Sequence, residues 1–400
     1  MELIISLIII IISSVIIMYA CDSFDDSASY LGRNMAPGVK GATINAIGSS
    51  MPELMTAFFL LFLFHERDGF AAGIATTAGS AIFNSVVIPA VCIFTVRYKG
   101  VIKDSLNSNG EIFREKIQSF NISKSSLLRD GFFLLLSEAA LIWFLSGTTM
   151  SWWMAVILNL IYISYFFFLA KGFGSSEEDG EEEEDEDNDE DEEQNSSSKI
   201  KALFTLDFNS LFFNSKEFST ATAWVVLLFA TLSISAACWA LAEAVMMSAE
   251  ALSIPPYFTA LIFAAAATSV PDTILSVKDA TRGDYDDAIS NAVGSNTFDI
   301  TVGLGLPLLL YTLIYNTDVT IISAPETQFL RIILLCITFL VIASLILQKK
   351  ITVFTAYFFT FIYFIWMLYI FNEAFIQIFY IYTLYFYLEV VKNLSVNQRN

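Results

Sequence analysis

The chain has 400 residues, of which 56% are hydrophobic and 15% aromatic, and it carries a formal net charge of −20. Together with a mean hydropathy of +0.62, this composition excludes a water-soluble globular protein and predicts one embedded in a lipid bilayer. The negative charge is concentrated, because residues 177–193 alone carry 15 Asp and Glu side chains.

The chain opens with an apolar run that has Glu2 but no Lys or Arg before it, which is unlike a secretory signal and predicts a retained helix. Apolar runs of about 18 residues or more predict membrane-spanning helices. An eleventh run, 374–391, is dominated by Tyr and Phe and either spans the bilayer or lies along its interface. The sequence predicts an all-α polytopic membrane protein with about ten transmembrane helices, at 3–20, 41–64, 71–96, 128–147, 152–171, 221–247, 257–278, 286–315, 328–347 and 351–371.

The acidic block lies in the longest stretch between these runs. A like-charge segment of this density repels itself and stays solvated. We therefore expect residues 173–218 to form a disordered loop that divides the chain into an N-terminal membrane half, 1–172, and a C-terminal membrane half, 219–400.

Two segments far apart in the sequence repeat each other, and each sets a carboxylate inside an apolar run. A carboxylate in hydrocarbon is costly, so an acid kept there marks a functional-site candidate. The first copy is Ala46-Ile47-Gly48-Ser49-Ser50-Met51-Pro52-Glu53 followed by Gly79-Ser80-Ala81-Ile82-Phe83-Asn84. The second copy is Ala265-Ala266-Ala267-Thr268-Ser269-Val270-Pro271-Asp272 followed by Gly294-Ser295-Asn296-Thr297-Phe298-Asp299.

The distribution of Lys and Arg predicts how these copies are oriented. Basic residues collect in loops that stay cytoplasmic, and one set of loops holds nearly all of them, whereas the opposite set holds only Arg67 and Arg331. This places the N-terminus outside and the acidic loop in the cytoplasm. Glu53 lies in the second span and Asp272 in the seventh, so the two copies enter the membrane from opposite faces. The sequence thus predicts an inverted-topology repeat, at about 38–97 and 257–313.

The repeated segments supply the chemistry of a cation site. Pro52 and Pro271 precede the acids, and a proline removes a helical hydrogen bond and frees carbonyl oxygens that can bind a cation where they line a cavity. Neighbouring hydroxyl, amide and carboxylate oxygens are hard donors that suit Ca²⁺ and Na⁺. They come from Ser49, Ser50, Asn84, Thr268, Ser269, Asn296 and Asp299.

Other polar or small residues in the spans have more modest interpretations. The only histidine, His65, lies in a loop and argues against a histidine-based site, and the four cysteines have no spacing typical of zinc or disulfides. Glu138 and Glu243 lack a repeated motif and are expected to have structural or lumen-edge roles. Gly79 and Gly294 have two equally weighted interpretations: they allow close helix packing, or they form part of the site.

These motifs resemble the cation/calcium exchanger superfamily, whose two alpha repeats carry patterns of the form G-S/T-S-x-P-E/D and G-S-x-x-F-N/D. Within it, the chain resembles the potassium-dependent sodium/calcium exchangers and their shorter bacterial relatives. The resemblance implies that Glu53 and Asp272 coordinate calcium, and that Asp299 stands where potassium-dependent members have an acid. It also implies ion-coordinating oxygens from Ser49, Ser50, Ser80, Asn84, Thr268, Ser269, Ser295 and Asn296.

We therefore expect a secondary active sodium/calcium antiporter of the cell membrane, dependent on potassium, with alternating access. It would be neither an enzyme nor a nucleic-acid-binding protein, and would need no cofactor beyond its transported calcium, sodium and potassium ions. A calcium/proton antiporter is the close alternative, because Glu53 and Asp272 could bind protons. A passive cation channel and a membrane scaffold acting through residues 177–193 are the remaining alternatives.

Overall fold

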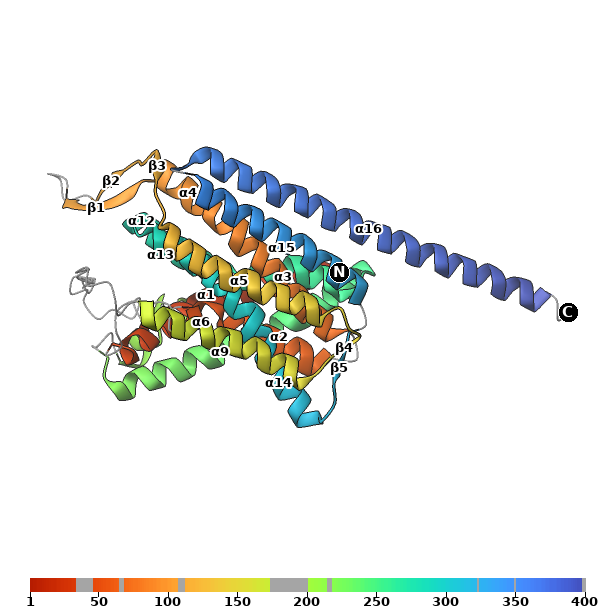
Figure 1. Cartoon of the computed structure of the whole chain (residues 1–400). Coiled ribbons are helices and arrows are strands. Elements are labelled where there is room, and N and C mark those ends of the chain that lie inside the picture. The colour runs from red at the N-terminus through yellow and green to blue at the C-terminus, as the bar shows by residue number, and fades with distance from the viewer. Residues whose placement is uncertain are drawn as a thin grey trace.

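The computed structural model describes residues 1–33, 46–64, 68–106, 112–172, 201–213, 218–321, 324–348 and 350–397. They form a bundle of long, roughly parallel and antiparallel helices (Figure 1). Helices dominate because a chain in lipid must satisfy its backbone polar groups internally. His65, Arg67 and the acidic block at 177–193 lie outside the described residues.

Helical elements account for both predicted membrane halves. The N-terminal half contains α1 (Glu2–Leu31), α2 (Ala46–Phe64), α3 (Gly69–Ile82), η3 (Phe83–Val87), α4 (Ile88–Tyr98), α5 (Lys124–Phe144) and α6 (Trp152–Gly172). The C-terminal half contains α9 (Thr220–Leu252), α10 (Pro256–Thr259), η5 (Ala260–Ala264), α11 (Ala265–Thr268), α12 (Val270–Arg282), α13 (Tyr285–Phe298), η6 (Asp299–Gly303), α14 (Leu304–Tyr315), α15 (Ala324–Leu347) and α16 (Val353–Asn397). Elements η3, η5 and η6 are single π-helical turns inside longer helices.

Among the described residues, seven helices are long and apolar enough to cross a membrane, or eight if the bent pair Pro256–Thr268 and Val270–Arg282 counts as one span. The polytopic, mainly helical fold is therefore confirmed. Helix α15 runs over 24 residues, and α5 carries Lys124, Arg129, Asp130 and Glu138 along its length. The number ten remains a prediction.

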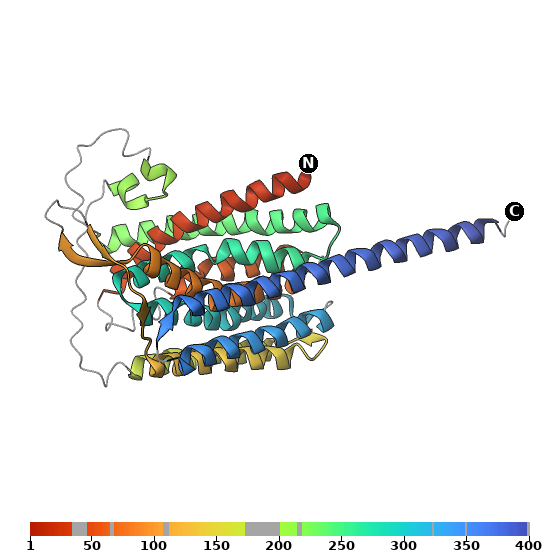
Figure 2. The same ribbon diagram turned by 90° about the horizontal axis from the view of Figure 1, so that it is seen from above.

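The two termini lie toward the same end of the bundle, opposite the hairpin of β1 (Val101–Leu106) and β2 (Ile112–Glu115) (Figure 2). A chain that crosses the membrane an even number of times, as the predicted ten spans would, has both termini on the same side. The C-terminal helix α16 is continuous over 45 residues and extends beyond the bundle. Residues 374–391 therefore continue α16 without a turn and are not a separate eleventh helix.

Short antiparallel strand pairs, which the all-α prediction did not include, close the ends of the bundle. Besides the β1–β2 hairpin, β3 (Ser119–Phe120) pairs with β6 (Ile351–Thr352), and β4 (Thr149–Met150) pairs with β5 (Val319–Thr320). The last two pairs join segments from opposite halves of the chain.

Part of the loop expected at 173–218 is folded. A short helix, α8 (Phe208–Phe213), lies against α9, where the ring of Phe229 is 4.9 Å from that of Phe212. Aromatic side chains stabilise this end of the loop by burying apolar surface. The argument from charge repulsion does not apply to it, because the dense acidic block, 177–193, lies upstream.

Helix α3 occupies the interior, and all of its side chains are buried. Its sequence is rich in Gly, Ala, Ser and Thr, which lets neighbouring helices approach closely in a membrane. At the outer edge, α1 and α9 pack side by side (red and green in Figure 2), and the hydroxyl of Ser248 donates a hydrogen bond of 2.8 Å to that of Ser6. The two repeats thus meet around α3, and the duplicated motifs lie there.

Candidate cation site

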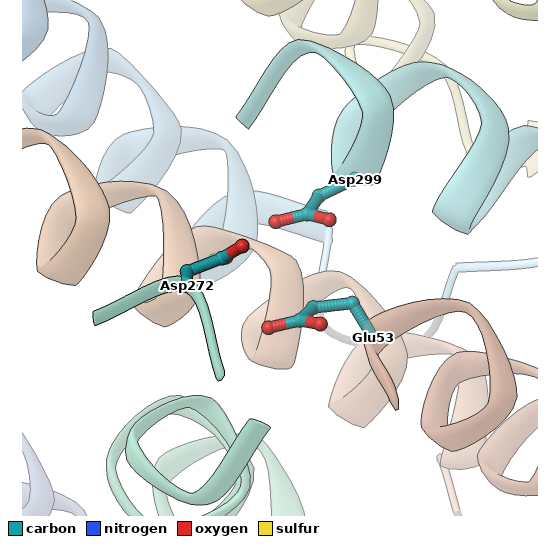
Figure 3. Close-up of side chains that lie close together, drawn as sticks. All are labelled: Glu53, Asp272 and Asp299. Atoms are coloured by element: carbon teal, nitrogen blue, oxygen red, sulfur yellow. The ribbon is translucent and has the colours of Figure 1, made fainter. Parts of the chain in front are cut away.

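Three carboxylates converge in the middle of the bundle. Glu53 on α2, Asp272 on α12 and Asp299 at the start of η6 each offer one oxygen atom, and these atoms lie within 4.8 Å of one another (Figure 3). All three side chains are 0% exposed. Among the described residues, no Lys or Arg forms an ion pair with any of them. The site is therefore a buried concentration of negative charge.

The second repeat reaches this site through a broken helix. The chain bends by 41° between α11 and α12, and Ser269 at the junction has φ −79° and ψ 3°. Pro271 lies in the first turn of α12, where its missing N–H costs nothing. The carbonyl of Ala267, one turn before the proline, accepts a hydrogen bond of 3.3 Å from the Ser14 hydroxyl on α1. A side chain of another helix therefore satisfies this freed oxygen.

The first repeat differs from the prediction of a matching break. Helix α2 runs from Ala46 to Phe64 with Pro52 inside it, so no interruption occurs at Pro52 itself. The Pro52 carbonyl accepts a contact of 3.6 Å from the Cys238 thiol of α9. Sequence reasoning did not link Cys238 to the site, because a single cysteine in an apolar run gives no signal.

Hydrogen bonds from neutral side chains stabilise the Asp272 carboxylate. Asn84 of η3 donates from Nδ2 to Asp272 Oδ2 at 2.9 Å, and Ser295 of α13 donates to Asp272 Oδ1 at 2.9 Å. Both oxygens of this acid are thus bonded, one from each repeat. Asp272 can stay ionised at a lower cost than an isolated buried carboxylate.

The Glu53 and Asp299 carboxylates are less well satisfied. The Ser80 hydroxyl lies 3.2 Å from Glu53 Oε1, 3.2 Å from Asp299 Oδ2 and 2.9 Å from Ser269 Oγ. A hydroxyl has one proton and can donate to only one of these acceptors. Glu53 Oε2 and Asp299 Oδ1 have no hydrogen-bond partner among the described residues. Two acids in this position need a cation or a proton between them.

The remaining predicted residues are as deeply buried as the carboxylates. All eleven residues of the predicted site are 0% exposed: Ser49, Ser50, Glu53, Ser80, Asn84, Thr268, Ser269, Asp272, Ser295, Asn296 and Asp299. Ser50 Oγ and Asn84 Oδ1 have no partner within the described part of the chain, so they are free to act as ligands. The Thr268 hydroxyl donates to the Ala265 carbonyl at 3.3 Å, which leaves its lone pairs available.

Asn296 bonds away from the carboxylates. Its Nδ2 donates to the Ala81 carbonyl at 2.9 Å and to Ser85 Oγ at 2.8 Å. It therefore connects α13 of the second repeat to α3 and η3 of the first. A second residue that sequence reasoning missed, Asn291, donates to Ser276 Oγ at 3.0 Å and to the Asp272 carbonyl at 3.5 Å. It lies one turn before Ser295 on α13.

The donor set fits a hard cation. Calcium takes six to eight oxygen ligands, from carboxylates, amides, hydroxyls and carbonyls. Three carboxylates together with free oxygens of Ser50 and Asn84 provide such ligands in one buried place. The cysteines are free thiols, three buried and Cys336 exposed, so no disulfide links the described helices.

Comparisons with known proteins match both halves of the chain. A family model described as sodium/calcium exchanger protein matches residues 5–171 and 222–372. Sodium/potassium/calcium exchanger 2 of Homo sapiens is 46% identical over 101 residues, 25% of this chain and 15% of that protein. Sodium/potassium/calcium exchanger Nckx30C of Drosophila melanogaster is 41% identical over 97 residues, 24% of this chain and 11% of that protein. The chain thus covers a small part of these curated relatives.

Solved structures share the fold at low sequence identity. The H⁺/Ca²⁺ exchanger CAX superposes with a TM-score of 0.62 at 14% identity, covering 92% of this chain and 81% of that chain. The sodium-calcium exchanger NCX_Mj superposes with a TM-score of 0.52 at 19% identity, covering 91% and 98%. These likenesses establish a common fold.

Proposed function

The chain belongs to the sodium/calcium exchanger protein family, and from this premise we propose that it is a secondary active sodium/calcium antiporter that depends on potassium. Family members are exchangers rather than enzymes and transport ions without a cofactor. One observation carries the proposal: Glu53, Asp272 and Asp299 meet in a buried site with unpartnered oxygens and no counter-charge among the described residues.

The mechanism follows from the cost of burying charge. An empty site with three ionised carboxylates resists dehydration, because each uncompensated buried charge costs several kcal/mol. Calcium together with a potassium ion, or several sodium ions, can cancel this charge and lower the cost of closing the site. Only loaded forms then pass between the two faces of the membrane, which couples calcium movement in one direction to sodium movement in the other.

We propose that the two repeats have inverted topology and expose this site alternately. Their motifs supply the ligands from opposite directions, and Asn84 and Asp272 come from different repeats yet share a hydrogen bond. Inverted repeats that meet at the membrane midplane are a recurrent design of secondary transporters. We place the protein in the cell membrane. The distribution of Lys and Arg supports an orientation with the N-terminus outside and the acidic loop in the cytoplasm.

Potassium dependence is argued from Asp299. This acid stands at the position where the first repeat has Asn84, and its Oδ1 has no partner among the described residues. A third carboxylate beside Glu53 gives a monovalent cation a place next to calcium. The sodium/potassium/calcium exchangers that match the chain support this assignment.

The test is calcium-45 uptake into sodium-loaded proteoliposomes, with external potassium either present or replaced by choline. Uptake that requires both internal sodium and external potassium is expected. Glu53→Gln should abolish uptake, because it removes one of the two charges that face calcium, and full activity in this variant would refute the assigned site. Uptake that needs only an imposed proton gradient would establish the calcium/proton antiporter instead. Calcium flux that needs no counter-ion gradient would indicate a channel.

A further inference from the structure

A second buried polar cluster lies outside the three carboxylates. Its two charged members are Arg331 on α15 and Glu138 on α5, each 2% exposed. The count of basic residues assigned Arg331 to a loop, although the predicted span 328–347 contains it. In the structure α15 begins at Ala324, and the Arg331 side chain is buried. A charged side chain in this environment is costly and persists only with partners, so its contacts indicate what it does.

Arg331 holds one turn of α3. Its Nη2 donates to the Ile74 carbonyl and to the Thr77 hydroxyl, and that hydroxyl also donates to the Ile74 carbonyl at 2.9 Å. Hydrogen bonds from a charged donor are roughly twice as strong as neutral ones. The guanidinium therefore fixes both the position and the rotation of this turn against α15.

The next turn of α3 belongs to the cation site. Ser80 follows Thr77 by three residues, so the two side chains lie on the same face of neighbouring turns. The Ser80 hydroxyl is 3.2 Å from both Glu53 and Asp299. A rotation or shift of the Ile74–Thr77 turn moves Ser80 relative to these carboxylates.

Glu138 compensates the buried cation. Thr338, two turns beyond Arg331 on α15, donates to Glu138 Oε1 at 2.9 Å. Glu138 Oε2 and Arg331 Nε and Nη1 have no hydrogen-bond partner among the described residues. Among the described residues, Arg331 and Glu138 form no direct ion pair, so their opposite charges attract each other only across a gap. A buried charge that loses its counter-charge destabilises the fold by several kcal/mol.

We propose that Arg331 is a positioning residue for the calcium site, and that Glu138 serves only as its counter-charge. The proposal rests on the exchange function proposed above. It assigns to α15, which carries none of the repeated motifs, control over the geometry of a ligand on α3. A double variant separates the positioning role of Arg331 from the charge balance between Arg331 and Glu138. Removing both charges leaves no unpaired buried charge, but it does not restore the contact of Arg331 to α3.

The experiment measures calcium binding by titration calorimetry, together with the thermal unfolding temperature, on the purified full chain. The variants are Arg331→Met, Glu138→Gln and the double variant, with Arg97→Met in the last turn of α4 as a matched cation control. Arg331→Met should lower the unfolding temperature and weaken calcium binding about tenfold. The double variant should regain most of the unfolding temperature yet still bind calcium about tenfold more weakly. Glu138→Gln and Arg97→Met should bind calcium as the parent does.

Wild-type calcium affinity in the double variant would overturn the proposal, since Arg331 would then matter only through its charge. Weakened binding in Glu138→Gln alone would also overturn it. If Arg331→Met cannot be purified, Thr77→Val provides the test by removing one acceptor of the guanidinium at nearly constant volume. It should weaken calcium binding, and unchanged affinity would contradict the assignment. A parent protein that neither binds nor transports calcium would refute the exchange function itself, which is a distinct outcome.

Discussion

Gly79 and Gly294 occupy equivalent places in the two repeats, yet alanine should have opposite effects at each. A Cβ atom at Gly79 would lie 2.1 Å from the Leu261 carbonyl oxygen and 2.5 Å from the Ala265 Cβ. At Gly294 the nearest atom is the Tyr165 hydroxyl, at an ordinary contact distance of 3.4 Å. Close helix approach thus depends on the glycine in the first repeat only.

The magnitude follows from what must move. Both obstacles at Gly79 are fixed to the backbone, so α3 and the η5–α11 segment must separate by about 1 Å, and overpacking of this kind costs about 1–3 kcal/mol. Ser80 directly follows the glycine, and Thr268 lies one turn after Ala265, so the separation opens the cation site. Misplacement of about 1 Å can reduce a rate about 100-fold. We expect the Gly79→Ala variant to lose at least about nine tenths of its calcium uptake, a loss of between about 10-fold and 100-fold.

The assay is calcium-45 uptake into sodium-loaded proteoliposomes, normalised to inserted protein, alongside the thermal unfolding temperature in detergent. Gly294→Ala is the matched control and should keep its uptake. Its unfolding free energy should stay the same or rise by about 0.5–1 kcal/mol, because alanine favours a helix over glycine. Equal loss in both variants would refute the packing argument and show that the glycines serve backbone flexibility instead.

Three further outcomes are expected. Asp299→Asn should retain calcium uptake but lose its stimulation by potassium, and undiminished stimulation would remove Asp299 from the potassium site. Deleting residues 177–193 should leave basic uptake intact, whereas its abolition would favour the scaffold alternative. Ser248→Ala should lower the free energy of unfolding by about 1 kcal/mol without changing the calcium dissociation constant, because the Ser6–Ser248 contact lies between α1 and α9; weaker calcium binding in titration calorimetry would contradict this.

The carboxylates of the site could be predicted from sequence because of an energetic contrast. An acid inside an apolar run is expensive, and two acids in matching motifs repeat that expense, so Glu53 and Asp272 are conspicuous. Their convergence with Asp299 within 4.8 Å agrees with the prediction that the two copies of the motif build one site. The buried polar core of the site was therefore accessible before the structure.

Local geometry was less accessible. The same Pro-acid pair directly follows a helix bend at Pro271 but lies within a continuous helix at Pro52. The π-helical turns η3 and η6 follow the Gly-Ser motifs of both repeats, although no composition rule distinguishes them from α-helix. The contacts of Arg331 could not be predicted, because its partners, Ile74 and Thr77, are far away in the sequence.

Asn84 and Asp299 occupy matching positions in the two repeats, and this difference decides whether the number of negative charges in the site is odd or even. Where the first repeat has a neutral amide, the second has a carboxylate, so the fully ionised site carries an odd number of negative charges. No whole number of divalent ions can cancel an odd charge. Calcium needs a monovalent companion or a proton to leave the buried site neutral, and Asp299→Asn, by making the number even, would let calcium do so alone.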